Sequence, residues 1–171
     1  MKTTFKPNVD LMKVFNSQIM LINDVNNSEN GQILIKAGAD GPPLHTHPEQ
    51  EEYFKIIKGQ LQVYHANKWV IVHEGEEIFT PKNMVHSYRS RDTEDCLFAY
   101  HLTPRRNFST MLQTFEKLTN EGKLKSTSDI QSIIYLAMAF KKYSSEIVST
   151  KPPAFVMSMM AGIGKLLRFK I

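Results

Sequence analysis

The chain has 171 residues, which is enough for one globular domain with a smaller appendage. Hydrophobic residues make up 42% of it and charged residues 22%, with 8 Gly and 8 Pro, a composition that excludes a low-complexity or disordered chain. A single cysteine, Cys96, excludes an intramolecular disulfide.

The charge and the N-terminal sequence bear on location and partners. The N-terminal sequence MKTTFKPNVD has no apolar segment behind its lysines, and no apolar run approaches the roughly 18 residues of a membrane span. We therefore expect a cytoplasmic protein without a transmembrane span. The net charge of +4 divides into −3 over residues 1–104 and +7 over 105–171, without aromatic residues interleaved in a basic stripe. We expect a solvated basic helical face and no nucleic-acid partner.

Short β-prone runs alternate with turn residues from Ser17 to Thr103. The runs are SQIMLI, QILIKAG, EYFKIIKG, QLQVYH, WVIVHEG, EIFTP, VHSYRS and DCLFAYHLTP. Strands this short and this closely spaced predict a β-sandwich or barrel, because βαβ units would need helical patterns between the strands.

The hydrophobic period becomes helical after Pro104. A first helix is predicted with its apolar stripe at Phe108, Met111, Leu112, Phe115 and Leu118, and with Gly122 beyond its end. A second is predicted from about Ser128, and a third after the Pro152-Pro153 pair. The predicted organisation is a barrel over 1–104 and a helical extension over 105–171, packed on the barrel or on a partner subunit.

The third predicted helix is amphipathic and basic. The large side chains of Phe155, Met159, Ile163 and Leu166 fall near one face, whereas Lys165 and Arg168 lie toward another. Such a helix can bind a membrane surface, but the small number of cations favours packing of the apolar face against the barrel or a second subunit.

Two histidines offer ligand atoms on one side of an extended segment. His45 and His47 are two residues apart, a spacing that points both side chains to the same face of a strand. The carboxylates of Glu51 and Glu52 follow, and they face opposite sides of the next strand. Because Lys55 shares the phase of Glu51 and belongs outside, we expect Glu52 to face inward.

A third histidine follows a predicted turn later in the chain. Pro81 and Asn83 form the turn, and His86 opens the next strand. Asn tolerates positive φ, so Asn83 can replace a glycine at a left-handed position. His45, His47, Glu52 and His86 are therefore candidate ligands of one metal ion.

The two segments resemble a known pair of motifs. HTHPEQEEYFKIIKG is similar to the first cupin motif and GEEIFTPKNMVHSYRS to the second. The resemblance implies an all-β cupin (jelly-roll) barrel of six to eight strands followed by a C-terminal helical extension, with His45, His47, Glu52 and His86 as metal ligands. Ala39 and Ser90 depart from the usual glycine and asparagine of the motifs. The following segment TPRRNFSTMLQTFEKL resembles the helix after the barrel in single cupins similar to quercetin dioxygenase.

The ligand set directs the functional hypotheses. Three imidazoles and one carboxylate close a tetrahedral zinc site but leave positions free on octahedral iron, manganese or nickel, which we favour as the divalent cofactor over zinc. The resemblance, more than the ligand set, implies a metal-dependent dioxygenase acting on a small organic substrate. We also expect Phe54 and Tyr88 to line the pocket and the protein to form a homodimer. The alternatives are a non-catalytic binding or sensing module and a metal-dependent isomerase. Tyr88, Tyr100 and His101 are ambiguous candidates for an additional acid or base.

Overall fold

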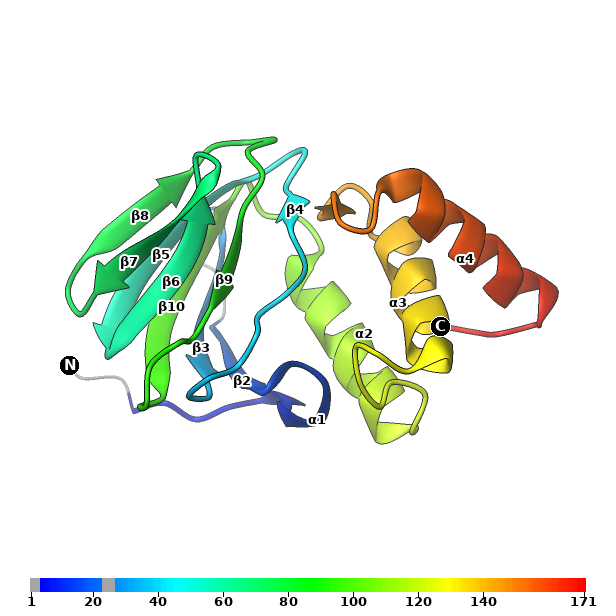
Figure 1. The fold of residues 1–171 in the computed structure, drawn as a ribbon, viewed down its shortest axis with the longest axis horizontal. Helices are drawn as coiled ribbons and strands as arrows, with labels where there is room; N and C mark the ends of the chain where they lie inside the picture. Colours follow the sequence, from blue (N-terminus) through cyan, green and yellow to red (C-terminus); the bar gives the residue numbers. More distant parts are fainter. Residues whose placement is uncertain (1–3, 23–26) are drawn as a thin grey trace.

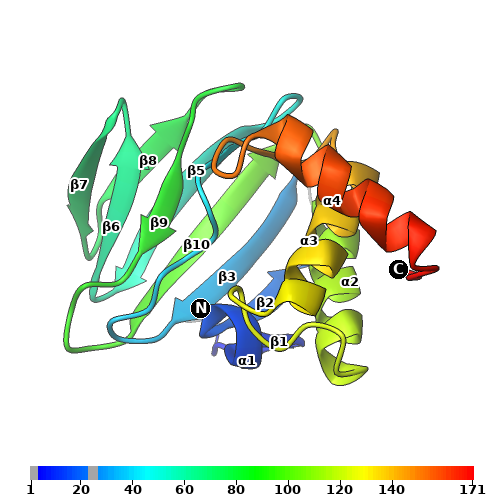
Figure 2. The same ribbon diagram turned by 45° about the vertical axis from the view of Figure 1, so that its right-hand side comes forward.

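A computed structural model describes residues 4–22 and 27–171. Two antiparallel sheets face each other and form the barrel, and three helices stand beside it (Figures 1 and 2). The larger sheet contains, in spatial order, β1 (Val9–Leu11), β2 (Ser17–Ile22), β3 (Glu29–Ile35), β10 (Cys96–Thr103), β5 (Glu51–Lys58) and β8 (Glu77–Thr80). The smaller sheet contains β7 (Lys68–His73), β6 (Gln60–His65) and β9 (Ser87–Arg89).

The core of the barrel follows from strict alternation along its central strands. In β3 and β10 every second residue is buried, and the register pairs the buried Phe98 with the buried Ile33. Cys96, at the start of β10, is fully buried, and burial raises the pKa of its thiol to about 12. The barrel therefore closes over an apolar interior, as the alternating sequence predicts.

The helical extension consists of α2 (Phe108–Asn120), α3 (Ile130–Lys142) and α4 (Ala154–Leu166). The apolar stripe predicted for the first helix is confirmed, because every one of its five residues is buried in α2. The residues of α3 from Ile134 to Phe140 are all buried, and α3 lies between α2 and α4 in both ribbon views.

A buried carboxylate of the barrel holds the start of α2. Glu29 lies on β3, and its oxygens accept hydrogen bonds from the backbone N–H groups of Arg106 (2.9 Å), Phe108 (2.9 Å) and Ser109 (2.6 Å). Burial raises the pKa of Glu29, but these hydrogen bonds outweigh it and hold the pKa below its ordinary value. The carboxylate also lies at the positive end of the helix, so it joins the barrel to the extension.

The packed face of α4 differs from the face predicted from its large side chains. Met157, Ala161 and Gly164 are buried, whereas Phe155 and Leu166 are exposed. A Cβ at Gly164 would collide with Sδ of Met138 and lie 2.8 Å from Cγ2 of Ile134. The helices approach closely through small residues, which the pattern of large side chains does not reveal.

The predicted fold class, a cupin-type barrel with a C-terminal helical extension, is confirmed. The sequence did not predict β1, the short helix α1 (Met12–Phe15), or the pairing of β4 (His45–Thr46) with β11 (Val148–Ser149). The turn expected after the first predicted strand includes residues 23–26, which lie outside the described residues. Within the described ranges, no helix has the length and hydropathy that a membrane span requires.

Candidate metal centre

Backbone pairing brings the two histidine segments together. The N–H of His45 donates to the carbonyl of His86 (3.0 Å), and the N–H of His86 donates back to His45 (2.9 Å). The N–H of Asn83 donates to the carbonyl of His47 (3.0 Å), and Asn83 has φ 63°, which confirms the left-handed turn position expected from the sequence. The main chain thus aligns the motifs without relying on the imidazoles.

Glu52 reaches the same place from the middle of the larger sheet. Its backbone pairs with Leu102 on one side and Thr80 on the other. The predicted strand phase is confirmed, because Glu52, Phe54 and Ile56 are buried whereas Lys55 and Ile57 are exposed.

The four candidate ligands converge in the barrel interior. Ligand nitrogens of His45, His47 and His86 all lie within 4.8 Å of one another, and all three side chains are buried. Oε2 of Glu52 lies 2.9 Å from Nε2 of His86 and 3.6 Å from Nε2 of His47. Two neighbouring ligands of one ion lie about 3 Å apart when each bond is about 2.1 Å long, so these separations suit a shared metal ion.

Main-chain carbonyls orient all three imidazoles. Nδ1–H of His45 donates to Pro43 (2.8 Å), that of His47 to Glu146 (2.5 Å) and that of His86 to Met84 (2.9 Å). With the proton on Nδ1, each neutral ring presents a lone pair at Nε2. This is the usual outer-shell arrangement of a metal-binding histidine.

The atoms that face the centre lack hydrogen-bond partners. Nε2 of His47, Nε2 of His86 and Oε2 of Glu52 are buried without a hydrogen bond among the described residues. In this tautomer, the 2.9 Å between Nε2 of His86 and Oε2 of Glu52 separates two lone pairs, a repulsive contact that a cation relieves. The residues therefore fit a divalent metal ion.

The protonation states of Glu52 and His45 agree with metal binding. Burial raises the pKa of Glu52, but attraction to the imidazoles of His47 and His86 outweighs it and holds the pKa far below its usual range. Burial, followed by repulsion from His86 and His47, holds the pKa of His45 well below its ordinary value. Burial lowers the pKa of His47, whereas the charge of Glu52 outweighs this and raises it. At neutral pH, Glu52 is ionised and His45 is neutral, the forms in which both bind metal ions.

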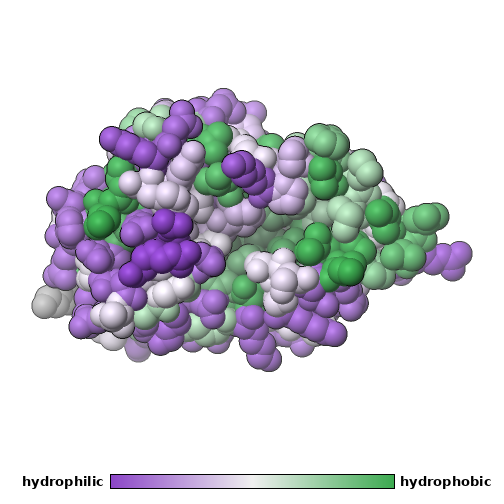
Figure 3. All heavy atoms as spheres, viewed as in Figure 1, coloured by the Kyte–Doolittle hydropathy of each residue, from purple (hydrophilic) through white to green (hydrophobic). Residues whose placement is uncertain are grey.

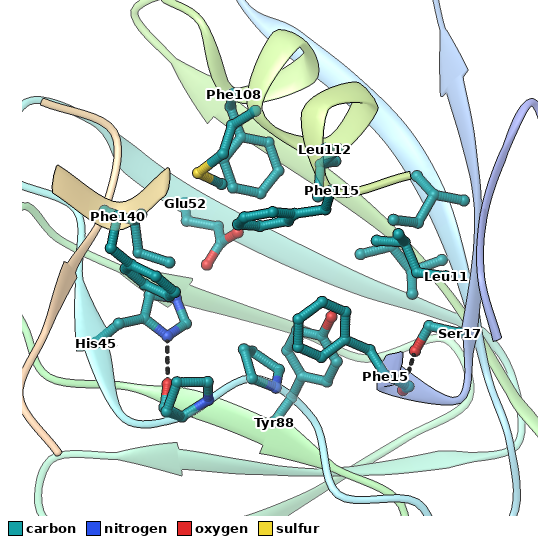
Figure 4. A pocket seen from close by; sticks show the side chains of 16 residues that line it. Leu11, Phe15, Ser17, His45, Glu52, Tyr88, Phe108, Leu112, Phe115 and Phe140 are labelled. Carbon is teal, nitrogen blue, oxygen red and sulfur yellow. Dashed lines mark hydrogen bonds between the residues drawn. The ribbon is translucent and has the colours of Figure 1, made fainter. Parts of the chain in front are cut away.

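An internal cavity of about 70 Å³ adjoins the cluster. His45 and Glu52 belong to its wall and point toward the space between the aromatic rings (Figure 4). Besides Leu11, Ile33 and other barrel side chains, the extension contributes much of the wall: Phe108, Met111, Leu112, Phe115, Phe140 and Ile147. The cavity therefore lies at the junction of the barrel and the extension.

Of the two residues predicted to line the pocket, Tyr88 does so and Phe54 does not. Tyr88 lines the cavity, and burial, with the nearby charge of Glu52, raises its pKa. Phe54 lies behind it, 5.7 Å from Tyr88 and 5.2 Å from Phe98 between ring centroids. Phe54 supports the cavity wall without forming part of it.

The extension also holds the strand that carries His45. The strand β11 pairs with β4 in the register Ser149 to His45, and the N–H of Thr150 donates to Leu44 (2.9 Å). Figure 1 shows this short pair between the barrel and α3. These contacts, and the hydrogen bond from His47 to the carbonyl of Glu146, could not be predicted from the spacing of residues in the sequence, because they join segments about a hundred residues apart.

Known proteins with similar sequences support the assignment of the barrel fold. Residues 31–102 match the family described as "Cupin domain". An oxidoreductase of Pestalotiopsis fici, iacF, is 30% identical over 81 residues, which are 46% of this chain and 40% of that protein. The protein named "Probable oxidoreductase virH" of Hypocrea virens is 32% identical over 75 residues, 42% of this chain and 34% of its own length. The matched segment thus spans well under half of these relatives.

A solved structure agrees at the level of the fold. An RmlC-like cupin from Shewanella frigidimarina superposes with a TM-score of 0.51 at 15% identity, covering 62% of this chain and 93% of that one. The family match falls on the barrel strands that carry the four candidate ligands. The barrel therefore has the cupin fold, and residues 31–102 are similar to the cupin domain.

Proposed function

We propose that the chain is a metal-dependent oxidoreductase of the dioxygenase type, acting on a small, largely apolar organic substrate. The observation that carries the proposal is the contact between a four-residue ligand cluster and a partly enclosed apolar cavity, since His45 and Glu52 belong to both. The oxidoreductase names of the two relatives support redox chemistry.

The donor set favours iron, manganese or nickel over zinc. Three imidazoles and one carboxylate leave positions for substrate on an octahedral ion but would close a tetrahedral one. A bound ion of this kind supplies a Lewis-acidic, redox-capable centre with a net positive charge. Glu52 contributes the one negative charge of the set, and its position in the middle of the sheet keeps that charge fixed.

The chain's own residues bind the substrate and exclude water. The aromatic walls from Phe108, Phe115 and Phe140 favour an apolar or aromatic molecule of modest size. Tyr88 keeps its phenolic proton at neutral pH because its pKa is raised, so its hydroxyl can donate a hydrogen bond to a substrate oxygen. The cavity thus combines apolar contact with one polar orienting group.

The lining of the cavity argues against metal-dependent isomerisation. Such a reaction needs a base to move a proton, and the polar lining residues beyond His45 and Glu52 are Ser17 and Tyr88. Tyr88 is a poor base at neutral pH, and the hydroxyl of Ser17 donates to the carbonyl of Phe15 (2.9 Å). The non-catalytic sensing alternative is separated from the oxidoreductase by experiment.

The test begins with elemental analysis of the purified protein and continues with oxygen uptake after loading with iron, manganese or nickel. Flavonols, catechols and diketones are the substrates to screen, and the His86→Ala variant is the control that should lose uptake. We expect one bound ion per chain and uptake with at least one substrate class. Metal binding without uptake in any class would favour the sensing module, and absence of bound metal would contradict both.

Two further expectations belong to the proposal: a homodimer and a cytoplasmic location without bound nucleic acid. Exposed apolar side chains on β2, β5 and β8, namely Ile22, Tyr53 and Phe79, give such a dimer a surface away from the helices. Light scattering after size-exclusion chromatography measures the mass, and a monomer would contradict this expectation.

A further inference from the structure

The outward side of α4 exposes large apolar side chains. Phe155 is 68% exposed, Met159 65% and Leu166 83%, and Ile163 and Leu167 are also exposed. We call these five residues the α4 ridge. Because an α-helix turns about 100° per residue, Phe155, Met159 and Leu166 fall opposite the face that Ala161 packs against α3. Figure 3 shows hydrophobic residues gathered at this end of the molecule.

Packing among the described residues 4–22 and 27–171 does not cover the ridge. The buried side of α4 already contacts α3 through Met157, Ala161 and Gly164. Five large apolar side chains in contact with water on one short helix exceed the scattered exposure that is normal for a globular surface. The ridge is therefore an exposed apolar surface that is available for binding a partner.

The charged side chains of α4 and of the residues that flank it are all positive. Residues 147–171 contain Lys151, Lys165, Arg168 and Lys170 and no Asp or Glu. Lys165 also lines a hollow of about 300 Å³ together with Lys141 and Lys142 from the end of α3. All of these lysines are exposed, so their charges are available to a partner.

We propose that the α4 ridge binds the surface of a membrane that contains anionic lipid. The helix would lie parallel to the surface, with the ridge at the level of the acyl chains and the lysines at the headgroup phosphates. A second copy of the chain is a poorer occupant, because two such surfaces would bring like charges together without a carboxylate side chain from residues 147–171 to neutralise them.

The test uses the full chain and vesicles of two compositions. Flotation with phosphatidylcholine vesicles is compared with flotation with vesicles that also contain phosphatidylserine. We expect binding only to the second kind, weakened by salt because the attraction is electrostatic. Binding to neither kind would overturn the proposal.

Two variants separate the apolar and the electrostatic contributions. Phe155→Ser combined with Leu166→Ser, and Lys165→Glu combined with Arg168→Glu, should each lower partitioning into anionic vesicles by at least about tenfold. All four side chains are exposed, so the fold and the metal content should not change. Ile71→Ser is the matched control, because Ile71 is an exposed apolar residue on β7, in the barrel.

The same variants exclude the competing occupant. Light scattering should give the wild-type mass for both ridge variants. A dimer that becomes a monomer when Phe155 and Leu166 are replaced would show that a second copy covers the ridge. Vesicle binding that survives in the ridge variants or fails equally in Ile71→Ser would also contradict the proposal.

Discussion

The barrel and the helical extension contribute to the same site in different ways. The barrel supplies the four side chains that face the proposed metal ion, whereas the extension supplies the carbonyl of Glu146 on His47, the strand beside His45 and six of the sixteen residues that line the cavity. The barrel thus supplies the ligands and orients His45 and His86 through the carbonyls of Pro43 and Met84, whereas the extension orients His47 and covers the cavity.

The extension is therefore part of the site, because it positions one of the ligands. His47 is positioned by its own turn and by a carbonyl 99 residues further along the chain. The side chain of Glu146 is fully buried, and its Oε1 accepts a hydrogen bond from Ser145 (2.8 Å) and lies 3.7 Å from Nε of Arg106. The loop that presents this carbonyl therefore depends on contacts within the extension.

The largest effect on metal affinity is expected from substitution of the ligands in the barrel. His86→Ala removes the imidazole that lies 2.9 Å from Glu52, so metal affinity should fall by more than about 100-fold while the barrel stays folded. Isothermal titration with Fe(II) or Co(II) and circular dichroism measure the two quantities. Glu52→Gln should also weaken binding, whereas Glu51→Gln, on the opposite face of β5, should not. The reverse ranking would contradict the ligand assignment.

A smaller effect on metal affinity is expected from substitution of Glu146 in the extension. Glu146→Ala removes the buried carboxylate that fixes the loop, and metal affinity should fall by about 10- to 100-fold, as for other outer-shell partners. Glu146→Gln keeps the shape and one acceptor oxygen and should restore most of the affinity. The absorption spectrum of the Co(II) form should shift in the first variant only. Unchanged affinity and spectrum in both would show that the extension merely covers the barrel.

The stabilisation that Glu29 gives by holding the start of α2 on the barrel should depend on pH. Glu29→Gln weakens the hydrogen bonds to the start of α2 and should lower the free energy of unfolding by about 1–2 kcal/mol at neutral pH. Because the folded-state pKa of Glu29 lies below its ordinary value, this contribution is present above the unfolded-state pKa and is lost as pH falls through the folded-state pKa. Urea unfolding of both proteins from neutral pH to well below the ordinary glutamate pKa of 4.5 should show the difference shrinking in acid. A constant difference would mean that the charge plays no part.

The smallest effects concern the packing of the extension itself. No atom lies within 4 Å of a Cβ built at Gly162, so Gly162→Ala should stabilise the protein by up to about 1 kcal/mol through helix propensity. Gly164→Ala should destabilise it, because the added Cβ meets Met138 and Ile134. Thermal unfolding measures both, and equal effects of the two substitutions would contradict the close packing of α4 on α3.

The barrel side could be predicted from the sequence because its signals are local. The spacing of His45 and His47, the phase of Glu52 and the turn at Asn83 each depend on neighbouring residues. The extension side could not, since the contact of Glu146 with His47 is set by tertiary packing. The face of α4 that packs within the chain could not be predicted for a related reason, because Ala161 and Gly164 pack through their small size and leave no signal in a hydrophobic pattern.

Anomalous diffraction from crystals of the metal-loaded full-length protein tests the central claim most directly. We predict one anomalous peak within bonding distance, about 2.0–2.2 Å, of Nε2 of His45, His47 and His86 and of a carboxylate oxygen of Glu52. The Nδ1–H of His47 should still donate to the carbonyl of Glu146, and the open coordination positions should face the cavity. A peak elsewhere, or an ion that lacks Glu52 or any of the three histidines, would contradict the account.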